Sequence, residues 1–194
     1  MPKQKITKEM VVNAAFELAK NGGMEQVMVK NIANKLNCSV QPVYTYCKNM
    51  AGLQHEVIKK TKDFVHKYIT SHTSKDNLFQ SIGHAYIQLA KEEPYIFKIF
   101  ILHQRENISS LDSLYQSEAD PKITEYIANE LNISRSQAKQ FHLNMLIYTT
   151  GLGTIFSVTT PGIPANEIFK QQEIAYNAFL KQIQNNNKEE NNEK

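Results

Sequence analysis

The segment NIANKLNCSVQPVYTYCKN, from Asn31 to Asn49, places a short apolar helix, a turn of small residues and a second short helix in close succession. Ile32, Ala33 and Leu36 would give the first helix one apolar edge. Asn37 tolerates a left-handed backbone at low cost, so a tight turn there lets the two helices meet at a steep angle. The segment therefore predicts two short helices joined by a tight turn.

The second helix of this segment combines an apolar anchor with an outward polar row. Ser39 is a good N-cap, and Pro42 falls in the first turn, where its missing N–H costs nothing. Val43 and Cys47 are four residues apart and can both face a core. The side chains left to face outward to varying degrees are Val40, Gln41, Tyr44, Thr45 and Tyr46.

Such an outward row fits recognition of DNA. A short helix held by a helix-turn-helix enters the major groove, which is about 12 Å wide, and Gln, Thr and Tyr can hydrogen-bond base edges and phosphates. From these residues alone a second interpretation stays open, because any helical hairpin can expose polar side chains.

The charge of the chain is unevenly distributed. Residues 1–75 contain 12 lysines and 5 acidic residues, which gives +7, whereas residues 76–194 contain 10 basic and 14 acidic residues, which gives −4. The first part is therefore a candidate polyanion binder. Because a lysine excess is common on protein surfaces, charge alone does not decide the function.

Composition is that of an ordinary globular protein. The chain has 194 residues with 41% hydrophobic content, which is enough for a real core. No apolar run approaches the roughly 18 residues that span a bilayer, and the polar start does not resemble a signal peptide, so we expect a cytoplasmic protein without a membrane partner. Cys38 and Cys47 lack zinc-site spacing, so we expect buried thiols and no metal site, with a redox switch as the alternative.

Apolar spacings of three and four residues along nearly the whole chain predict an all-α protein. Thr7 is expected to cap the first helix, which the Gly22-Gly23 pair ends. Pro94 interrupts a second apolar stripe, and the following segment YIFKIFIL is expected to form a buried helix. Ser134 and Gln137 predict a capping box at the start of a long helix. The further expected helices cover about 29–36, 40–47, a longer stretch after Asn49, 121–131, and a last helix after TTPGIPAN.

These patterns predict two helical parts connected by a helix. The expected boundaries are a three-helix helix-turn-helix DNA-binding domain at 1–50, a linking helix at 51–74, a larger helical domain at 75–185, and a disordered tail at 186–194. Effector binding and dimerisation are expected of the domain at 75–185 from its aromatic content and from the family resemblance given below. The tail is too polar to pack, which is why we expect disorder.

Residues 7–58 closely resemble the DNA-binding region of the TetR (tetracycline-repressor) family. The resemblance rests on the Ala14-Ala15 pair with NGG, then KNIANKLNCS, then PVYTYCKN with Leu53 a few residues later. It implies that Tyr44 and Lys48 hold the phosphate backbone and that Tyr46 can reach a phosphate. It also implies base-facing positions at Gln41, Pro42 and Thr45, with Val40, following Ser39.

The chain departs from the family pattern at several core positions. Met28 stands where the family usually has a capping Ser or Thr, and Ala19 and Cys47 stand where it has aromatic residues. A lysine is frequent in the family at Met50. These departures imply a smaller core, refilled by Met24, Met28 or Met50.

The resemblance further implies a homodimer in which helices at 134–157 and 164–185 pair with their copies. Operator recognition also requires a dimer. Two half-sites of a palindromic double-stranded operator lie about 34 Å apart, and one small helix contacts few bases. Gly151 and Gly153 are candidates for close helix approach. They are not a dinucleotide fingerprint, because no strand precedes them.

Aromatic and methionine residues of the second part are candidates to line a cavity for a small apolar or aromatic effector, with His84, His103 and His142 as polar contacts. The alternative is that these side chains are plain core, because such residues at helical spacing usually pack against one another. The candidates are Phe79, Tyr86, Phe97, Phe100, His103, Phe141, Met145 and Tyr148.

Two other functional classes are alternatives for an all-α chain. A di-iron enzyme needs Glu-x-x-His pairs on facing helices, and only Asp63-x-x-His66 and His103-x-x-Glu106 come near this spacing. GxSxG, P-loop and HExxH motifs are absent from the sequence, so we expect no enzyme and no cofactor. The other class is a ligand-independent dimeric regulator whose second domain only dimerises or binds a protein.

Overall fold

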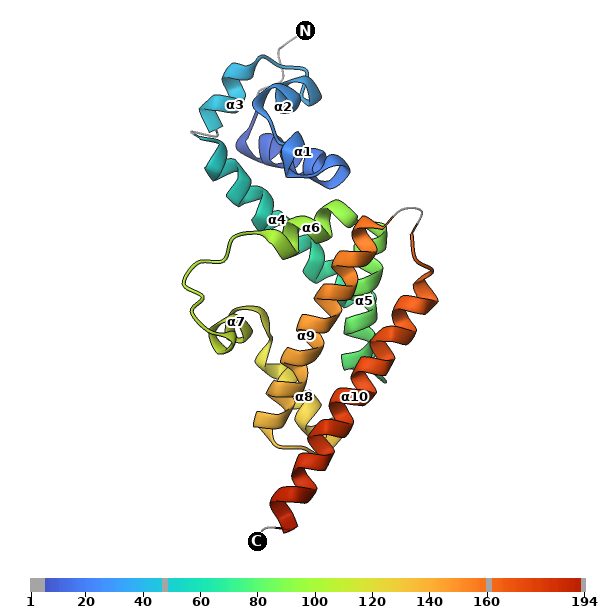
Figure 1. Ribbon diagram of the computed structural model, residues 1–194. Helices are drawn as coiled ribbons and strands as arrows, with labels where there is room; N and C mark the ends of the chain where they lie inside the picture. Colours follow the sequence, from blue (N-terminus) through green and yellow to red (C-terminus); the bar gives the residue numbers. More distant parts are fainter. Residues whose placement is uncertain (1–5, 47–48, 160–161, 193–194) are drawn as a thin grey trace. The chain divides into compact units, whose positions relative to one another are not determined.

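The computed structural model describes residues 6–46, 49–159 and 162–192, with side chains described as far as residue 185 (Figure 1). The regular structure of these described residues is entirely helical, which confirms the all-α prediction. The chain separates into two compact units. Unit 1 consists of Met1–Ser71 and Leu89–His103, and unit 2 consists of His72–Gln88 and Gln104–Lys194.

The first helix begins and ends where its sequence predicts. In α1 (Lys8–Gly22) the Thr7 side chain accepts a hydrogen bond from the Met10 amide at 3.2 Å, which satisfies one of the unpaired N–H groups of the first turn. Gly23 ends the helix with a φ of 85°, a conformation that glycine adopts without strain. A single 3-10 turn, η1 (Met24–Gln26), follows.

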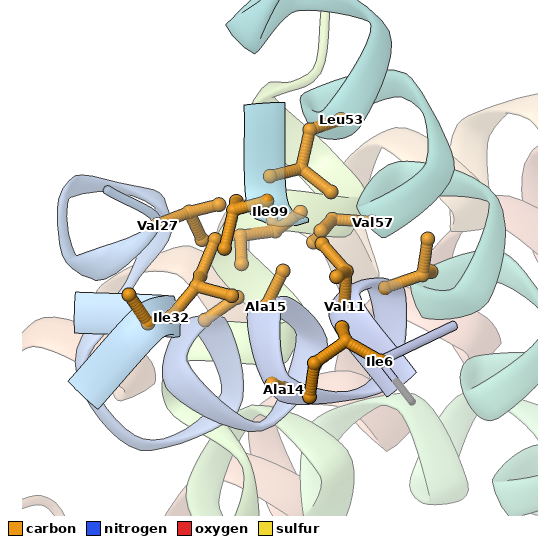
Figure 2. Close-up of a cluster of buried hydrophobic side chains, with 13 residues drawn as sticks. Ile6, Val11, Ala14, Ala15, Val27, Ile32, Leu53, Val57 and Ile99 are labelled. Carbon is orange, nitrogen blue, oxygen red and sulfur yellow. The ribbon is translucent and has the colours of Figure 1, made fainter. Parts of the chain in front are cut away.

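A buried apolar cluster joins several helices of unit 1. The helices α2 (Val29–Lys35), α3 (Val40–Tyr46) and α4 (Met50–Ser71) follow η1 and contribute buried side chains to it. The core also includes Ile99, which comes from a much later part of the chain (Figure 2). The labelled members of this cluster are Ile6, Val11, Ala14, Ala15, Val27, Ile32, Leu53, Val57 and Ile99.

Ile99 lies on α6 (Pro94–Leu102), which follows α5 (Leu78–Glu92) after the break that Pro94 was predicted to cause. Glu93, the N-cap of α6, forms an ion pair with Lys20 of α1 at 2.7 Å. The expected boundary near residue 75 assigned 89–103 to the second domain, whereas in the structure this segment clusters with the N-terminal helices. The physical reason is the burial of Ile99 together with the Glu93 ion pair, neither of which helical periodicity reveals.

Unit 2 contains the first part of α5, as far as Gln88, and the four helices that follow α6 in the described residues. These are α7 (Leu111–Glu118), α8 (Pro121–Leu131), α9 (Arg135–Val158) and α10 (Ala165–Asn192). The predicted capping box at the start of α9 is present: the Gln137 amide donates to Ser134 Oγ, and the Ser134 amide donates to Gln137 Oε1. Ile127, Ala138, Phe141, Met145 and Ile183 form a buried cluster among α8, α9 and α10.

The tail at 186–194 was expected to be disordered. The structure continues α10 to Asn192, and the expected disorder of the tail stays a prediction. The segment YIFKIFIL was expected to form a buried helix, and six of its eight residues are buried or half-buried, whereas Tyr95 and Leu102 are exposed.

Candidate nucleic-acid interface

The turn between α2 and α3 closes as a left-handed cap. Asn37 has a φ of 49°, the conformation expected from its sequence. Its amide donates to the Asn34 carbonyl at 3.1 Å, and the Cys38 amide donates to the Ala33 carbonyl at 3.0 Å. These bonds satisfy carbonyls at the end of α2 that would otherwise be unpaired, so α3 leaves the turn in a defined direction.

The helix α3 is held by one fully buried side chain. Val43 has no exposed surface and belongs to the core of unit 1, while Tyr46 is half-buried and packs against the same core. On the other side of the helix, Val40 is 44% exposed and Tyr44 is 56% exposed. A helix this short is stabilised mainly by such tertiary packing.

The structure brings most of the predicted DNA-contacting residues onto one accessible surface. Ser39, Val40, Gln41, Tyr44 and Thr45 are exposed, and we call this set the α3 outer row. The Thr45 hydroxyl donates to the Gln41 carbonyl at 3.0 Å, so its oxygen lone pairs remain suited to accept. Pro42 is half-buried, like Tyr46. The expected phosphate contact Lys48, and the expected core residue Cys47, lie outside the described residues.

Two exposed lysines of α2 were not among the predicted DNA contacts. Lys30 and Lys35 lie on α2, are exposed and form no ion pair within the described residues. By contrast, Lys8 of α1 pairs with Glu56 of α4 at 2.5 Å, and this pair lowers the pKa of the Glu56 carboxyl. Only the overall lysine excess of residues 1–75 pointed to cations of this kind.

The structure confirms that Met28 does not cap α2, but it contradicts the expectation that Met28 refills the core. Met28 occupies the N-cap position and provides no side-chain hydrogen bond. It is 51% exposed and therefore does not refill the core, whereas Met24 and Met50 do pack against it. An unbranched methionine side chain fills irregular gaps, which explains how the core tolerates its missing aromatic residues.

The predicted effector-pocket residues are divided between the two units. Phe97, Phe100 and His103 belong to unit 1, and Phe79, Tyr86, Phe141, Met145 and Tyr148 belong to unit 2. Within unit 2 several of them pack against aromatic neighbours: the ring centroids of Phe79 and Phe141 are 5.6 Å apart, and those of Phe141 and Tyr176 are 5.1 Å apart. Contacts of this kind are those of a core.

Unit 2 also contains an uncharged polar cluster. The Tyr115 hydroxyl lies 2.6 Å from Thr124 Oγ1 and 2.8 Å from His142 Nδ1. Burial lowers the pKa of His142 to about 4, so this imidazole is neutral at pH 7. Tyr115, Thr124 and His142 can therefore exchange hydrogen bonds but carry no charge near neutral pH. Elsewhere in unit 2, burial, together with the charge of Glu118, raises the pKa of Tyr86 to about 12.

Large apolar side chains are also exposed on α9 and α10. Ile147, Ile155 and Val158 of α9 and Ile174 of α10 are each between 49% and 61% exposed. A Cβ atom built on Gly151 would meet nothing within 4 Å. We call these five residues the α9–α10 apolar face.

The described residues contain neither a metal-ligating cluster nor a membrane-spanning helix. No group of His, Cys, Asp and Glu side chains there is arranged to hold a metal ion. None of the helices in that part of the chain has both the length and the apolar character needed to cross a bilayer.

Comparison with known proteins identifies one curated relative and several solved structures, while no family model matches the chain. The relative is an uncharacterized HTH-type transcriptional regulator, YobS, of Bacillus subtilis (strain 168), with 25% identity over 105 residues. That match covers 52% of this chain and 54% of YobS, so the chain spans about half the length of the curated relative it matches.

The solved structures cover nearly the whole chain. A tetR-family transcriptional regulator from Streptomyces coelicolor superposes with a TM-score of 0.62 at 12% identity, covering 91% of this chain and 87% of that one. A transcriptional regulator from Rhodococcus sp. Rha1 superposes with a TM-score of 0.54 at 14% identity, covering 91% and 97% of the two chains. The fold implied by residues 7–58 is thereby confirmed. These similar proteins are all transcriptional regulators, in agreement with the expectation that the chain is not an enzyme.

Proposed function

We propose that this chain, which has the fold of TetR-family transcriptional regulators, is a homodimeric, sequence-specific repressor that a small apolar or aromatic ligand releases from its operator. The observation that carries the proposal is the α3 outer row, a set of polar and aromatic side chains exposed on a short helix that Val43 anchors. A protein acting on chromosomal DNA in this way works in the cytoplasm.

The roles of the outer row follow from the chemistry of its side chains. Gln41 and Thr45 can exchange hydrogen bonds with base edges, so they determine which sequence is preferred. Tyr44 and Lys48 hold phosphates, which fixes the register of α3 in the groove without reading sequence. Lys30 and Lys35 add phosphate contacts that depend on salt.

The α9–α10 apolar face supports dimerisation. Four large apolar side chains exposed on two helices are unfavourable in water unless another surface covers them, and Gly151 lets a second backbone approach closely. A second copy of the chain is the occupant we propose, since a palindromic operator needs two copies of α3 related by a twofold axis. The face lies on the helices that the family resemblance assigns to the dimer.

Release of the operator requires coupling to unit 1, and α6 is the candidate element. Ile99 packs in the core that also holds Val43, and Glu93 pairs with Lys20. A displacement of α6 would therefore disturb the packing that positions α3. A difference of about 1–3 kcal/mol in ligand affinity between the two arrangements is enough to shift DNA binding.

A second candidate is a ligand-independent regulator. It is favoured by the packing of Phe79, Phe141 and Tyr176 against one another, which is how core residues behave. In that case unit 2 serves only to dimerise or to bind a protein. Native mass spectrometry of the purified protein separates the two: a co-purified small molecule supports the ligand-responsive form, and a ligand-free dimer supports the alternative.

The central test is fluorescence anisotropy with a labelled palindrome selected from the DNA that flanks the gene. We expect binding by a dimer, with affinity that falls steeply as salt rises because phosphate contacts release counterions. A shuffled fragment of equal length is the control. Equal affinity for both fragments, or a monomer at every concentration, would contradict the proposal.

A further inference from the structure

Unit 1 contains a cleft that the DNA-binding role does not use. It lies among the η1 turn, α4 and α6 and has a volume of about 380 Å³. This volume falls in the range of small-molecule sites, which is about 300–1,000 Å³. The apolar part of its wall is formed by Met24, Ile58, Tyr95, Ile99 and Leu102.

Two of these wall residues are unusually exposed. Leu102 is 72% exposed and Tyr95 is 37% exposed, although both are large apolar side chains. Single exposed apolar residues are normal on a surface, but here they border a concave site. An apolar body placed in the cleft would therefore remove both side chains from water.

The cleft also contains a cation without an acidic partner. Lys98 is half-buried, and its ammonium lies 5.6 Å from the centre of the Tyr95 ring. No carboxylate in the described part of the chain forms an ion pair with it. Glu25 lines the same cleft from η1 but is exposed, so water screens its charge more than that of Lys98.

We propose that this cleft is a binding site for a small amphipathic carboxylate, whose apolar or aromatic body lies against Tyr95, Ile99 and Leu102 and whose carboxylate pairs with Lys98. A charge-assisted hydrogen bond to a half-buried ammonium is stronger than one made in open solvent. The bound molecule would bridge η1, α4 and α6, and so it stabilises one arrangement of the helices that hold α3. This site lies wholly within unit 1, and its existence does not depend on the proposed DNA binding.

Isothermal titration calorimetry of the full-length protein tests the site, with naphthalene-2-carboxylate as the probe. The neutral naphthalene-2-carboxamide and the cationic 2-naphthylmethylamine are matched comparison compounds. We expect one carboxylate bound per chain, with the amide and the amine each weaker on the order of tenfold. No binding of the carboxylate at millimolar concentration, or tighter binding of the amine, would overturn the proposal.

Paired variants locate the bound probe. Lys98→Gln and Leu102→Glu are expected to weaken carboxylate binding on the order of tenfold each, while Glu25→Gln is expected to strengthen it a few-fold. Their controls are Lys122→Gln and Leu111→Glu, which change an exposed lysine and an exposed leucine of unit 2. Because Leu102 is largely exposed, its substitution leaves the core intact, and an unchanged melting temperature checks this. Equal affinities in the Leu102→Glu and Leu111→Glu proteins would place the probe elsewhere and overturn the site.

Discussion

The helices α3 and α9 each have one buried face and one exposed face, but their exposed faces differ in chemistry. On α3 the exposed residues include Gln41, Tyr44 and Thr45, whereas on α9 they include Ile147 and Ile155. Side chains with hydrogen-bonding groups stay hydrated until a polar partner such as DNA replaces the water. Apolar side chains gain only from a partner that excludes water. The same amphipathic principle therefore serves two kinds of partner in one chain.

The largest expected effect comes from the exposed face of α9. Replacing Ile155 with Asp puts a charge into the proposed dimer interface, where an unpaired charge would be desolvated. We expect the dimer dissociation constant to rise on the order of a hundredfold or more, with weaker operator binding as a consequence. Analytical ultracentrifugation measures the first effect and anisotropy the second.

Ser117→Asp is the control, since it adds the same charge at an exposed polar position of α7, outside the α9–α10 apolar face. If the Ile155→Asp protein remains as dimeric as the wild type, the exposed apolar residues of α9 do not form the dimer interface.

The buried face of α9 is expected to make stability depend on pH. The pKa of His142 is lowered by burial to about 4 from an ordinary value of 6.5, so the unfolded chain binds its proton first as the pH falls. Above about pH 6.5, protonation of His142 does not reduce the free energy of unfolding. As the pH drops to about 4, the preference of the proton for the unfolded chain lowers this free energy by about 3 kcal/mol. Urea denaturation at several pH values measures this.

His142→Gln is expected to flatten the part of the profile between pH 4 and 6.5, and His66→Gln, at an exposed position of α4, is expected to leave it unchanged. Identical pH profiles for the two variants would show that His142 does not set this dependence.

A substitution on the buried face of α3 is expected to change the free energy of unfolding less than protonation of His142 on α9 does. Val43→Ala removes two methyl groups from a fully buried site and is expected to destabilise unit 1 by about 2 kcal/mol. Val40→Ala, on the exposed side of the same helix, is expected to change stability by less than about 0.5 kcal/mol. Denaturant midpoints of the two alanine variants measure the difference, and equal midpoints would mean that α3 is not anchored by Val43.

Substitutions on the exposed face of α3 are expected to change DNA binding and to leave the stability of the protein unaltered. Tyr44→Phe removes a phosphate contact and should weaken binding to all sequences by about 1 kcal/mol. Gln41→Ala should instead change which base is preferred at one position of each half-site. Binding to a panel of single-base operator variants distinguishes the two patterns. A uniform loss in both proteins would remove Gln41 from the base-contacting set.

Local sequence patterns were sufficient to predict elements whose causes are themselves local. Thr7 caps α1, Ser134 opens α9 with Gln137, and Asn37 takes the left-handed conformation in the turn, as expected from neighbouring residues. The α3 outer row was predictable for the same reason, because Val43 alone decides which side of this short helix faces the core. Its role in binding DNA stays a prediction.

Features that depend on distant residues were not predictable. Gly83 of α5 has no side chain where Gln172 of α10 places its amide, and that amide donates to Thr149 Oγ1 of α9 at 3.1 Å. A Cβ at Gly83 would collide with the Gln172 side chain. Helical periodicity predicts at most that Gln172 faces inward, and it does not predict the contacts with Gly83 and Thr149.

The sequence by itself determined that the chain is helical, where most of its helices begin, and that Val40, Gln41, Tyr44 and Thr45 of α3 face outward, whereas Tyr46 packs against the core. These properties depend on capping, helix propensity and apolar spacing, all of which act within a few residues. Only the tertiary structure decided that α6 belongs with the N-terminal helices, that Ile99 completes their core, and that Lys98 lies in a cleft where no carboxylate of the described residues forms an ion pair with it. Packing joins residues far apart in the chain, and one helical face can satisfy its burial against many alternative partners.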